Sequence, residues 1–314
     1  MKRKQITVKR QIQKKIELRN QQIAFLDNKG GPKKNMSAMN ERDRERIYGS
    51  GKPAINVELL TRDEMRMGKV ENDEILPILE VKLPISIIIT AYQTQEFIEE
   101  CLDSIENQTY FINNDDYEVL IGVDGCKETL YKILQIKDKY RNISVFMMGS
   151  NMGTYVTSNT LLDLTKYDNI LRFDSDDVMK PQMINEIMHF PSYDVVQFRF
   201  SDFTTNIGEY NNNFKYVAAG AHFYKKTVLD IAGGYRSWRC AADSEFIKRI
   251  SKVTKIKKME KRLFYRRGHT KSLTNRKETN LNSQIRTTYL KKIRIYNSDE
   301  RIKIRKRINT YVKI

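Results

Sequence analysis

The chain of 314 residues carries a net charge of +17 and is 40% hydrophobic and 30% charged. This length accommodates one large domain with extensions or two domains, and the hydrophobic share is enough for a core. Three cysteines are too few and too scattered for a disulfide framework or a zinc site, which favours a reducing compartment. No segment has the pattern of a signal peptide, and no apolar run approaches the roughly 20 residues that span a bilayer. These features predict a soluble, cytoplasmic protein.

The positive charge is concentrated at the two ends of the chain. Residues 251–314 hold 21 Lys and Arg against 4 Asp and Glu, residues 1–30 hold 9 against 2, and residues 84–250 hold 16 against 23. Basic ends on an acidic body suggest a polyanionic partner, such as nucleic acid, an anionic membrane surface or an anionic glycan. A general lysine-rich bias with no role in binding explains the same counts.

The first 80 residues predict a basic helical arm and a linker. Residues 5–26 carry isoleucine and leucine at three-to-four spacing, which indicates an amphipathic helix, and Gly30-Gly31-Pro32 ends it. Residues 30–75 are polar and rich in charge, as expected for a linker.

A regular alternation of strands and helices begins at Pro84. Apolar runs predict strands at 85–91, 117–123, 143–147 and 169–173, and helical spacing predicts helices at 95–108, 127–141, 154–166 and from Pro181. This order indicates a mostly parallel sheet with right-handed crossovers. Strands at 195–200, 220–224 and 263–269, with a helix at 243–249, predict a smaller mixed or antiparallel part.

Segments with hydroxyl or carboxylate side chains lie at the ends of three of the predicted strands: Thr90-Ala91-Tyr92, Asp124-Gly125 and residues 174–177. Ligands of parallel sheets bind beyond the carboxyl ends of strands, so we expect these segments to meet at one edge. The three carboxylates of Asp174, Asp176 and Asp177 repel one another unless they are hydrated or bind a cation. Mg²⁺ and Mn²⁺ prefer such oxygen ligands. A solvated acidic turn before the next helix is the alternative.

The order of these segments resembles that of the GT-A fold glycosyltransferases, in particular the inverting family 2. The resemblance covers about residues 83–273 and rests on TAY, DG, NMG, FDSDD, AGGYR and YRRGHTKS in this order. It implies a Rossmann-like, mostly parallel α/β sheet flanked by helices, a nucleotide-sugar donor, and Mn²⁺ or Mg²⁺ at a DxD motif.

The resemblance also implies roles for individual residues. Asp124 matches the carboxylate that contacts the base, and His269 matches a late histidine that reaches the metal or the diphosphate. The implied nucleotide-sugar-binding residues are Thr90, Ala91, Tyr92, Asp124, Asp174 and Ser175. The implied metal ligands are Asp174, Asp176 and His269.

The segment that starts at Ala242 resembles the acidic helix start of the family, which places Asp243 as the catalytic base. Glu245 is the second candidate for the base and, with Trp238, a candidate for acceptor contact. Asp243 also suits an ordinary helix cap, and Trp238 either stacks on an acceptor or belongs to the core.

Three positions depart from the family pattern, and they leave the donor open. Gly125 replaces a second acid after the second strand, Ala242 replaces a glutamate, and Ser158 replaces an arginine before Asn159. Asn159 itself is expected to be a structural hydrogen-bonding residue.

We therefore predict a metal-dependent glycosyltransferase that moves a sugar from a nucleotide sugar, in first place a UDP-sugar, to a hydroxyl with inversion. The acceptor is a glycan, a lipid-linked molecule or a protein. The first alternative is the same chemistry on modified bases of DNA, gripped by basic residues 301–307. The second is a non-catalytic GT-A-like module that binds nucleotides or polyanions. The expected division is an arm and linker at 1–80, a GT-A domain at 81–273 and a basic helical extension at 274–314.

Overall fold

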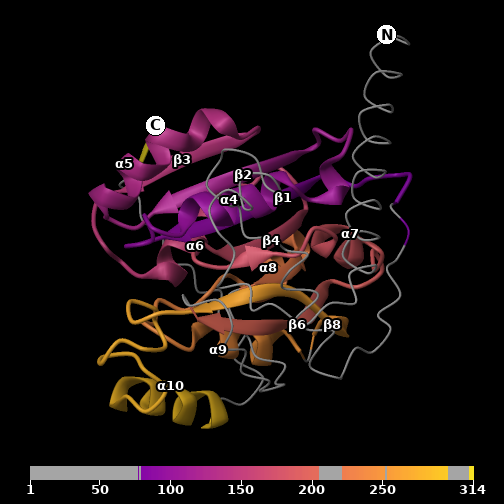
Figure 1. The fold of residues 1–314 in the computed structure, drawn as a ribbon. Coiled ribbons are helices and arrows are strands. Elements are labelled where there is room, and N and C mark those ends of the chain that lie inside the picture. Colours follow the sequence, from indigo (N-terminus) through magenta and orange to yellow (C-terminus); the bar gives the residue numbers. More distant parts are fainter. Residues whose placement is uncertain (1–76, 78, 205–220, 252, 296–310) are drawn as a thin grey trace, which may run out of the picture. The chain divides into compact units, whose positions relative to one another are not determined.

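The computed structural model describes residues 77, 79–204, 221–251, 253–295 and 311–314. The predicted N-terminal helix, almost all of its linker and the basic run at 301–307 lie outside this part. Within it, the strands form one nine-stranded sheet in the order β5-β8-β6-β7-β4-β1-β2-β3-β9 (Figure 1). The strands are β1 (Ile85–Ala91), β2 (Tyr117–Val123), β3 (Ile143–Met148), β4 (Asn169–Asp174), β5 (Val178–Met179), β6 (Val195–Thr204), β7 (His222–Lys225), β8 (Ile256–Gly268) and β9 (Tyr311–Lys313).

The predicted parallel core of the sheet is confirmed. Strand β1 pairs in parallel with both β2 and β4, and β2 pairs in parallel with β3. In this register Thr90 lies opposite Asp174, and Ala91 lies opposite Val123. The carboxyl ends of β1, β2 and β4 therefore share one edge of the sheet.

The outer strands give the sheet its mixed character. Strand β7 runs antiparallel to both β4 and β6, β5 runs antiparallel to β8, and β6 and β8 pair in parallel. At the other edge β9 pairs antiparallel with β3. The described part of the predicted helical extension therefore contains a strand as well as a helix.

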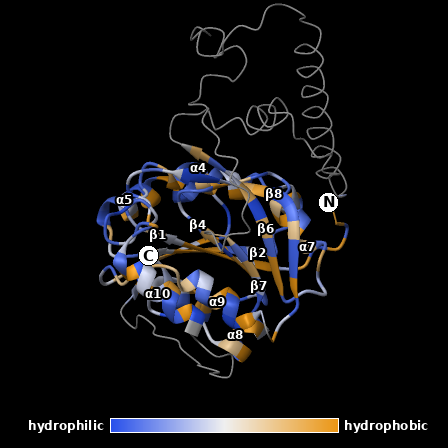
Figure 2. Ribbon diagram, turned by 90° about the horizontal axis from the view of Figure 1, so that it is seen from below, coloured by the Kyte–Doolittle hydropathy of each residue, from blue (hydrophilic) through white to orange (hydrophobic). Residues whose placement is uncertain are grey.

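Helices cover both faces of the sheet, so the domain has three layers (Figure 2). Apolar side chains of α4, α5 and α7 join alternate residues of β1 in one core, and those of α6, α8 and α9 form a second core on the other face. The helices are α4 (Ile98–Glu106), α5 (Lys127–Ile136), α6 (Thr154–Leu164), α7 (Met183–Met188), α8 (Lys226–Ala232), α9 (Ala242–Ile250) and α10 (Gln284–Ile295).

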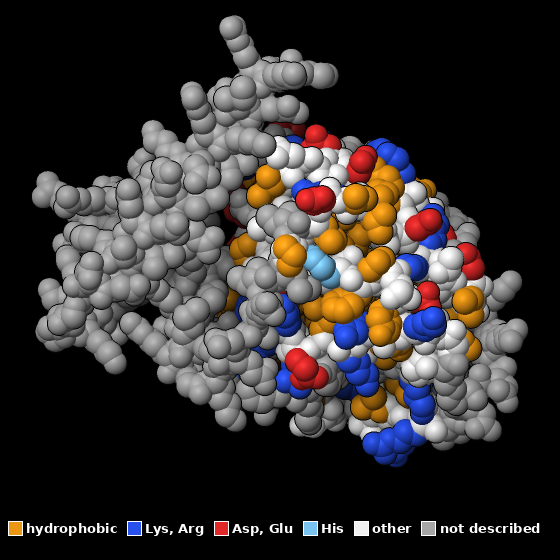
Figure 3. Space-filling view, turned by 90° about the vertical axis from the view of Figure 1, so that its right-hand side faces the viewer, with side chains coloured by type: hydrophobic (Ala, Val, Ile, Leu, Met, Phe, Trp, Pro, Cys, Tyr) orange, Lys and Arg blue, Asp and Glu red, His pale blue; other side chains and the backbone are white. Residues whose placement is uncertain are grey.

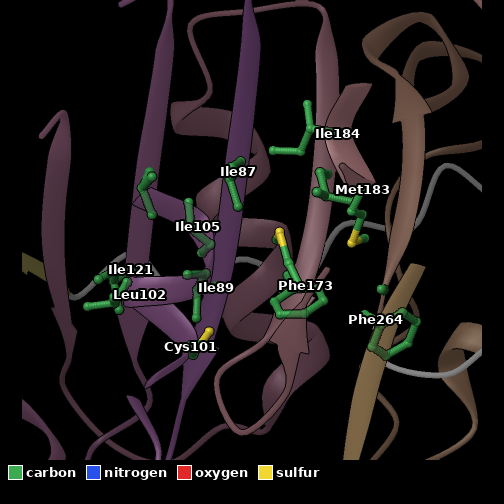
Figure 4. Packing of buried hydrophobic residues seen from close by; sticks show 14 of the residues in the cluster. Ile87, Ile89, Cys101, Leu102, Ile105, Ile121, Phe173, Met183, Ile184 and Phe264 are labelled. Carbon is green, nitrogen blue, oxygen red and sulfur yellow. The ribbon is translucent and has the colours of Figure 1, made fainter. Parts of the chain in front are cut away.

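The larger core explains why β1 is a continuous apolar run. Ile87 and Ile89 of β1 lie against Leu102 and Ile105 of α4, and Phe173 extends the same layer from β4 (Figure 4). All seven residues of β1 are buried, since the strand has neighbours on both sides and helices on both faces. Strand β4 thereby has a rigid support at the point where its acidic segment begins.

Local differences from the predicted elements have simple causes. The helix expected from Pro181 begins at Met183, with Gln182 at its N-cap; the carbonyls of Lys180 and Gln182 accept the backbone N–H groups of Met183 and Glu186. Helix α8 was not predicted, since its seven residues are too few for a clear helical period. It ends at Gly233, whose φ of 71° favours glycine.

Lys and Arg side chains gather in the lower part of the face shown in Figure 3, with hydrophobic side chains between them. None of the helices in the described residues is long and apolar enough to cross a membrane.

Candidate functional site

The segments that follow β1, β2 and β4 meet at one edge of the sheet, as predicted. The backbone N–H of Asp124 donates to the carbonyl of Ala91 at 2.9 Å, which joins the ends of β2 and β1. Thr90 lies opposite Asp174 in the register, and its hydroxyl is 2.6 Å from the hydroxyl of Thr154 at the start of α6. Helix α6 therefore begins beside the acidic end of β4.

Asp124 fixes the loop that leads into α6. Its carboxylate accepts the backbone N–H groups of Met152 and Gly153 at 2.9 Å each and the hydroxyl of Thr157 at 3.0 Å. Gly125 beside it needs to be glycine, because a Cβ at this position would lie 2.5 Å from the nitrogen of Asn151. The structure thus gives Asp124, which is buried, a loop-positioning role, and its contact with a base stays a prediction.

The three carboxylates after β4 form the candidate metal centre. One oxygen from each of Asp174, Asp176 and Asp177 can be chosen so that all three lie within 4.8 Å of one another. Nε2 of His269 lies 2.8 Å from Oδ2 of Asp176, which brings the predicted histidine to the same place. The ring of His269 also packs on Phe97, with 4.7 Å between the ring centroids. The sequence therefore identified a set of residues that are neighbours in space.

These carboxylates differ in their exposure and in their partners. Asp174 and Asp176 are partly exposed, whereas Asp177 is buried and accepts the backbone N–H of Arg267 at 2.9 Å. Burial, with repulsion from Asp176 and Asp243, raises the pKa of Asp174 to about 6, although Arg172 opposes the shift. Burial likewise raises the pKa of Asp177. Asp174 and Asp176 are thus the members open to a ligand, and Asp177 ties the turn to β8.

Arg172 is a site residue that the sequence analysis missed. Its side chain is only 3% exposed, although it projects from a strand in the middle of the sheet. The guanidinium donates to Oδ1 of Asp174 at 2.8 Å and contacts the hydroxyls of Thr154 and Ser158 at 3.1 and 3.2 Å. A charged residue inside an apolar strand was the available signal, because such a residue is seldom buried without a partner.

Asp243 is linked to this centre through Arg172, which donates to Asp174 and opposes the rise of the pKa of Asp243, and the charge of Asp243 in turn raises the pKa of Asp174. Asp243 is the second residue of α9, and Ala241 occupies the N-cap position, so the capping alternative for Asp243 is wrong. Burial raises the pKa of the Asp243 carboxyl, while Arg172, the N–H of Ser244 and the hydroxyl of Tyr155 oppose that shift. The carboxyl predicted to be the base and the metal centre therefore belong to one site.

The structure corrects the interpretation of Glu245. This side chain is 4% exposed, and Nε of Arg236 and Nε of Arg249 both lie 2.9 Å from its Oε1. Nη2 of Arg249 occupies Oε2 at 2.9 Å and also donates to the carbonyl of Gly234 at 2.8 Å. Glu245 is therefore a structural anchor for the turn after α8, and it is not placed to contact an acceptor or to act as the base.

Trp238 contacts the C-terminal extension. Its ring is stacked on Tyr289 of α10, with 4.4 Å between the centroids and 3° between the planes. The ring also packs on the core beneath α9. One face of Trp238 is thus covered by Tyr289, and its contact with an acceptor stays a prediction.

Two further predicted residues, Ser175 and Tyr92, lie in the segments that follow β4 and β1. Ser175 is buried and donates to the hydroxyl of Thr94 at 3.0 Å, and the guanidinium of Arg276 lies 5.2 Å from the centre of the Tyr92 ring. Asn159 makes two hydrogen bonds of 2.8 Å with the backbone of Tyr235, which confirms the structural role expected of it.

The donor set fits a hard divalent cation. Asp174 and Asp176 present partly exposed carboxylate oxygens within one small cluster, and such oxygens are the ligands that Mg²⁺ and Mn²⁺ prefer. Beside them stands a separate carboxyl, Asp243, with a raised pKa. This arrangement can hold a cation with one group of acids and accept a proton with another.

Comparison with known proteins identifies the family of this chain. Residues 86–247 match the model of glycosyl transferase family 2. The poly(ribitol-phosphate) beta-glucosyltransferase of Bacillus spizizenii is 37% identical over 97 residues, which is 30% of this chain and 15% of that protein. The chondroitin synthase of Escherichia coli is 34% identical over 102 residues, which is 32% of this chain and 14% of that protein. The chain thus spans a small part of these relatives.

Solved structures show the same fold. A mannosyltransferase from Pyrobaculum calidifontis, in complex with GDP-Man and Mn²⁺, superposes with a TM-score of 0.55 at 15% identity, over 80% of this chain and 75% of that one. TarS of S. aureus, residues 1–349 in complex with UDP-GlcNAc, gives 0.51 at 20% identity, over 60% and 59% of the two chains. These similarities confirm the predicted GT-A fold class.

Proposed function

The chain belongs to glycosyl transferase family 2, and from this premise we propose that it transfers a sugar from a nucleotide sugar to an acceptor hydroxyl. The observation that carries the proposal is the pair of acidic groups that share Arg172: the guanidinium donates to Asp174 of the Asp174–Asp176 cluster and favours the ionised form of Asp243. One group suits the diphosphate of a donor through a cation, and the other suits the hydroxyl of an acceptor.

Asp174 and Asp176 would hold Mn²⁺ or Mg²⁺, with His269 fixing Asp176 from behind. A bound divalent ion acts as a Lewis acid that stabilises the charge of the departing diphosphate. Arg172 keeps Oδ1 of Asp174 engaged, which leaves the other carboxylate oxygen of Asp174 for the ion. The buried Asp177 holds the turn through the backbone of Arg267 and keeps this geometry fixed.

Asp243 would remove the proton from the acceptor hydroxyl. The pKa of such a hydroxyl lies far above 7, so it needs a base within hydrogen-bond reach. Tyr155, Ser244 and Arg172 all favour the ionised form of Asp243, against the effect of burial. Since Glu245 is fully used in ion pairs, a single carboxylate remains for this role at the start of α9, which supports in-line displacement with inversion.

The donor proposed is a UDP-sugar, with Tyr92 and Asp124 near its base and Thr90, Ala91 and Ser175 along the floor of the site. A structural relative in complex with UDP-GlcNAc supports this nucleotide. We propose a glycan or a polyol phosphate as the acceptor, because one relative is named a chondroitin synthase and another a poly(ribitol-phosphate) beta-glucosyltransferase.

A thermal-shift screen of nucleotide sugars, with and without Mn²⁺, tests the proposal. A ligand that binds only the folded state raises the melting temperature, and about 100 times its Kd adds about 2.7 kcal/mol of stability. We expect one nucleotide class to stabilise the protein in Mn²⁺ and to lose most of that effect in EDTA. A shift from no nucleotide sugar in Mn²⁺ would favour the non-catalytic binding module.

A further inference from the structure

We infer that Arg286 of α10 binds an oxyanion group, a phosphate or a carboxylate, on the acceptor substrate beside the hydroxyl that Asp243 deprotonates. This inference rests on the proposed function and names the chemical class of its acceptor. It also assigns the C-terminal segment a part in the site.

Helix α10 lies along α9, the helix that carries Asp243 (Figure 2). Near their C-terminal ends, Nζ of Lys248 in α9 donates to the carbonyl of Ile293 in α10 at 2.6 Å. One turn back along α10, Tyr289 stacks on Trp238. Arg286 precedes Tyr289 by three residues and so lies on the same side of α10, at the end where α9 begins.

The charge of Arg286 acts on three neighbours that surround the start of α9. It favours the ionised forms of Asp243, Tyr155 and Cys240. The packing of α10 thus places Arg286 on the side of the site that holds Asp243, and its effect on these three pKa values agrees with that position. Asp174 and Asp176 have Arg172 and His269 as their partners instead.

In the part of the chain that the structure describes, the guanidinium of Arg286 makes hydrogen bonds to the protein through Nε but not through Nη2. Its Nε donates to the carbonyl oxygens of Thr279 and Asn280 at 2.9 and 3.2 Å, which fixes the direction of the side chain. Its Nη2 is buried and has no hydrogen-bond partner among the described residues. A buried charged donor without a partner costs free energy, so a ligand that satisfies it gains affinity.

The surroundings suit an anion more than a neutral group. Glu245, the other acid of α9, forms ion pairs with Arg236 and Arg249. Arg239 donates to Oδ1 of Asn151 in the loop that leads into α6. An anionic group on the acceptor is therefore repelled by the carboxylate of Asp243, and the positive charge of Arg286 offsets this repulsion. A planar guanidinium with free donors is well suited to phosphate and carboxylate oxygens.

The test uses the full chain saturated with Mn²⁺ and with UDP or GDP, whichever binds, so that the donor site is filled. Glycerol 3-phosphate is titrated by calorimetry against glycerol, and glucuronate against glucose. We expect one anionic probe to bind at least about tenfold more tightly than its neutral counterpart, because a guanidinium forms charge-assisted hydrogen bonds with an oxyanion. Arg286→Gln should remove this preference, and Arg286→Lys should retain part of it.

Arg294→Gln is the matched control, because Arg294 is an exposed arginine of the same helix. It should change the affinity for the anionic probe by less than about twofold. Equal losses in the two variants, or preferential binding of duplex DNA that depends on both arginines, would show diffuse attraction and overturn the inference. An anion preference that persists in Arg286→Gln, with an unchanged melting temperature, would also overturn the inference.

If neither nucleotide binds in Mn²⁺, the proposed function fails and the inference fails with it. If a nucleotide binds but no anion preference appears, the inference alone is wrong.

Discussion

Arg172 is the residue on which the charge balance of the site depends. Burial raises the pKa of Asp174 and that of Asp243, and the charge of Asp243 adds to the effect at Asp174. The guanidinium of Arg172 opposes it at both carboxyls, while the hydroxyls of Thr154 and Ser158 hold the guanidinium in place. A buried cation between two acids lets them lie close together without both being protonated.

Asp243→Asn tests the role of the base. We expect kcat to fall by about a hundredfold or more, because the amide cannot accept the proton, while the Kd of the donor in Mn²⁺ changes little. Initial rates and nucleotide titrations measure the two effects separately. Asp230→Asn, at an exposed position of α8, is the control. A near-normal rate in Asp243→Asn would assign the base to another residue.

Metal affinity should depend on pH through Asp174. Because the pKa of its carboxyl is raised to about 6, a proton competes with the ion below that pH. The apparent Kd for Mn²⁺ should therefore rise as the pH falls from about 7 to about 5, by up to about tenfold per pH unit. Above about pH 7 it should stay constant. Calorimetric titration of Mn²⁺ at these pH values provides the measurement.

The sign of the accompanying stability change follows from the same pKa. The metal-free folded state holds the Asp174 proton more tightly than the unfolded chain does, so the free energy of unfolding should decrease as the pH rises from about 4 to about 6. An Mn²⁺ affinity that stays constant over the acidic range would contradict the assignment of Asp174 as a ligand.

At the level of elements, α9 has two functions at successive turns. Its first turn holds Asp243 at the site. Glu245 and Arg249 form an ion pair along the helix, and Arg249 binds the carbonyl of Gly234 in the turn that follows α8. Their ion pair is buried, and buried pairs are costly to break because one charge stays behind without a partner. The position of Asp243, the proposed base, thus depends on an ion-pair cluster that has no part in the proposed chemistry.

Glu245→Ala should lower the free energy of unfolding by about 3–5 kcal/mol, because it leaves Arg236 and Arg249 without their common buried acid. Glu260→Ala removes the partner of Arg199 from an exposed pair and should cost about 1 kcal/mol or less. Urea unfolding of both variants makes the comparison. Equal, small losses would show that the Glu245 cluster does not anchor the turn.

The sequence predicted those elements whose pattern is local. The boundaries of β1 and β2 were predicted to the residue, because β1 is a mostly apolar run that starts after Pro84, and Asp116 and Asp124 flank β2. Strand β9 was missed, since its three exposed residues are a strand only through their pairing with β3. The docking of α10 on α9 was also missed, because a stacked pair such as Trp238 and Tyr289 leaves no periodic signal.

At the scale of the molecule, the topology brings the residues of the site together. Parallel strands place Thr90, Asp124 and Asp174 at one edge, which made this part of the site predictable from strand order alone. The roles of Arg172, Glu245 and Arg286 depend instead on contacts between separate elements: β4 with α6, α9 with the turn after α8, and α10 with α9. Such contacts follow from the packing of α6, α9 and α10, which sequence patterns do not encode.

The basic C-terminal region is part of this arrangement. Residues 274–295 reach the catalytic side through Arg276 at Tyr92 and through α10 at α9, so the extension proposed for 274–314 contacts the GT-A domain. An acidic centre bordered by basic residues suits a donor and an acceptor that both carry negative charge.

Nucleotide binding by Asp176→Ala tests the central claim most directly. The account predicts that wild-type protein binds its donor nucleotide at least about tenfold more tightly in Mn²⁺ than in EDTA, and that Asp176→Ala loses this difference while it keeps its fold. Asp230→Ala should retain the difference in full. An unchanged affinity of Asp176→Ala for the nucleotide in Mn²⁺ would contradict the assignment of the acidic cluster as the metal centre.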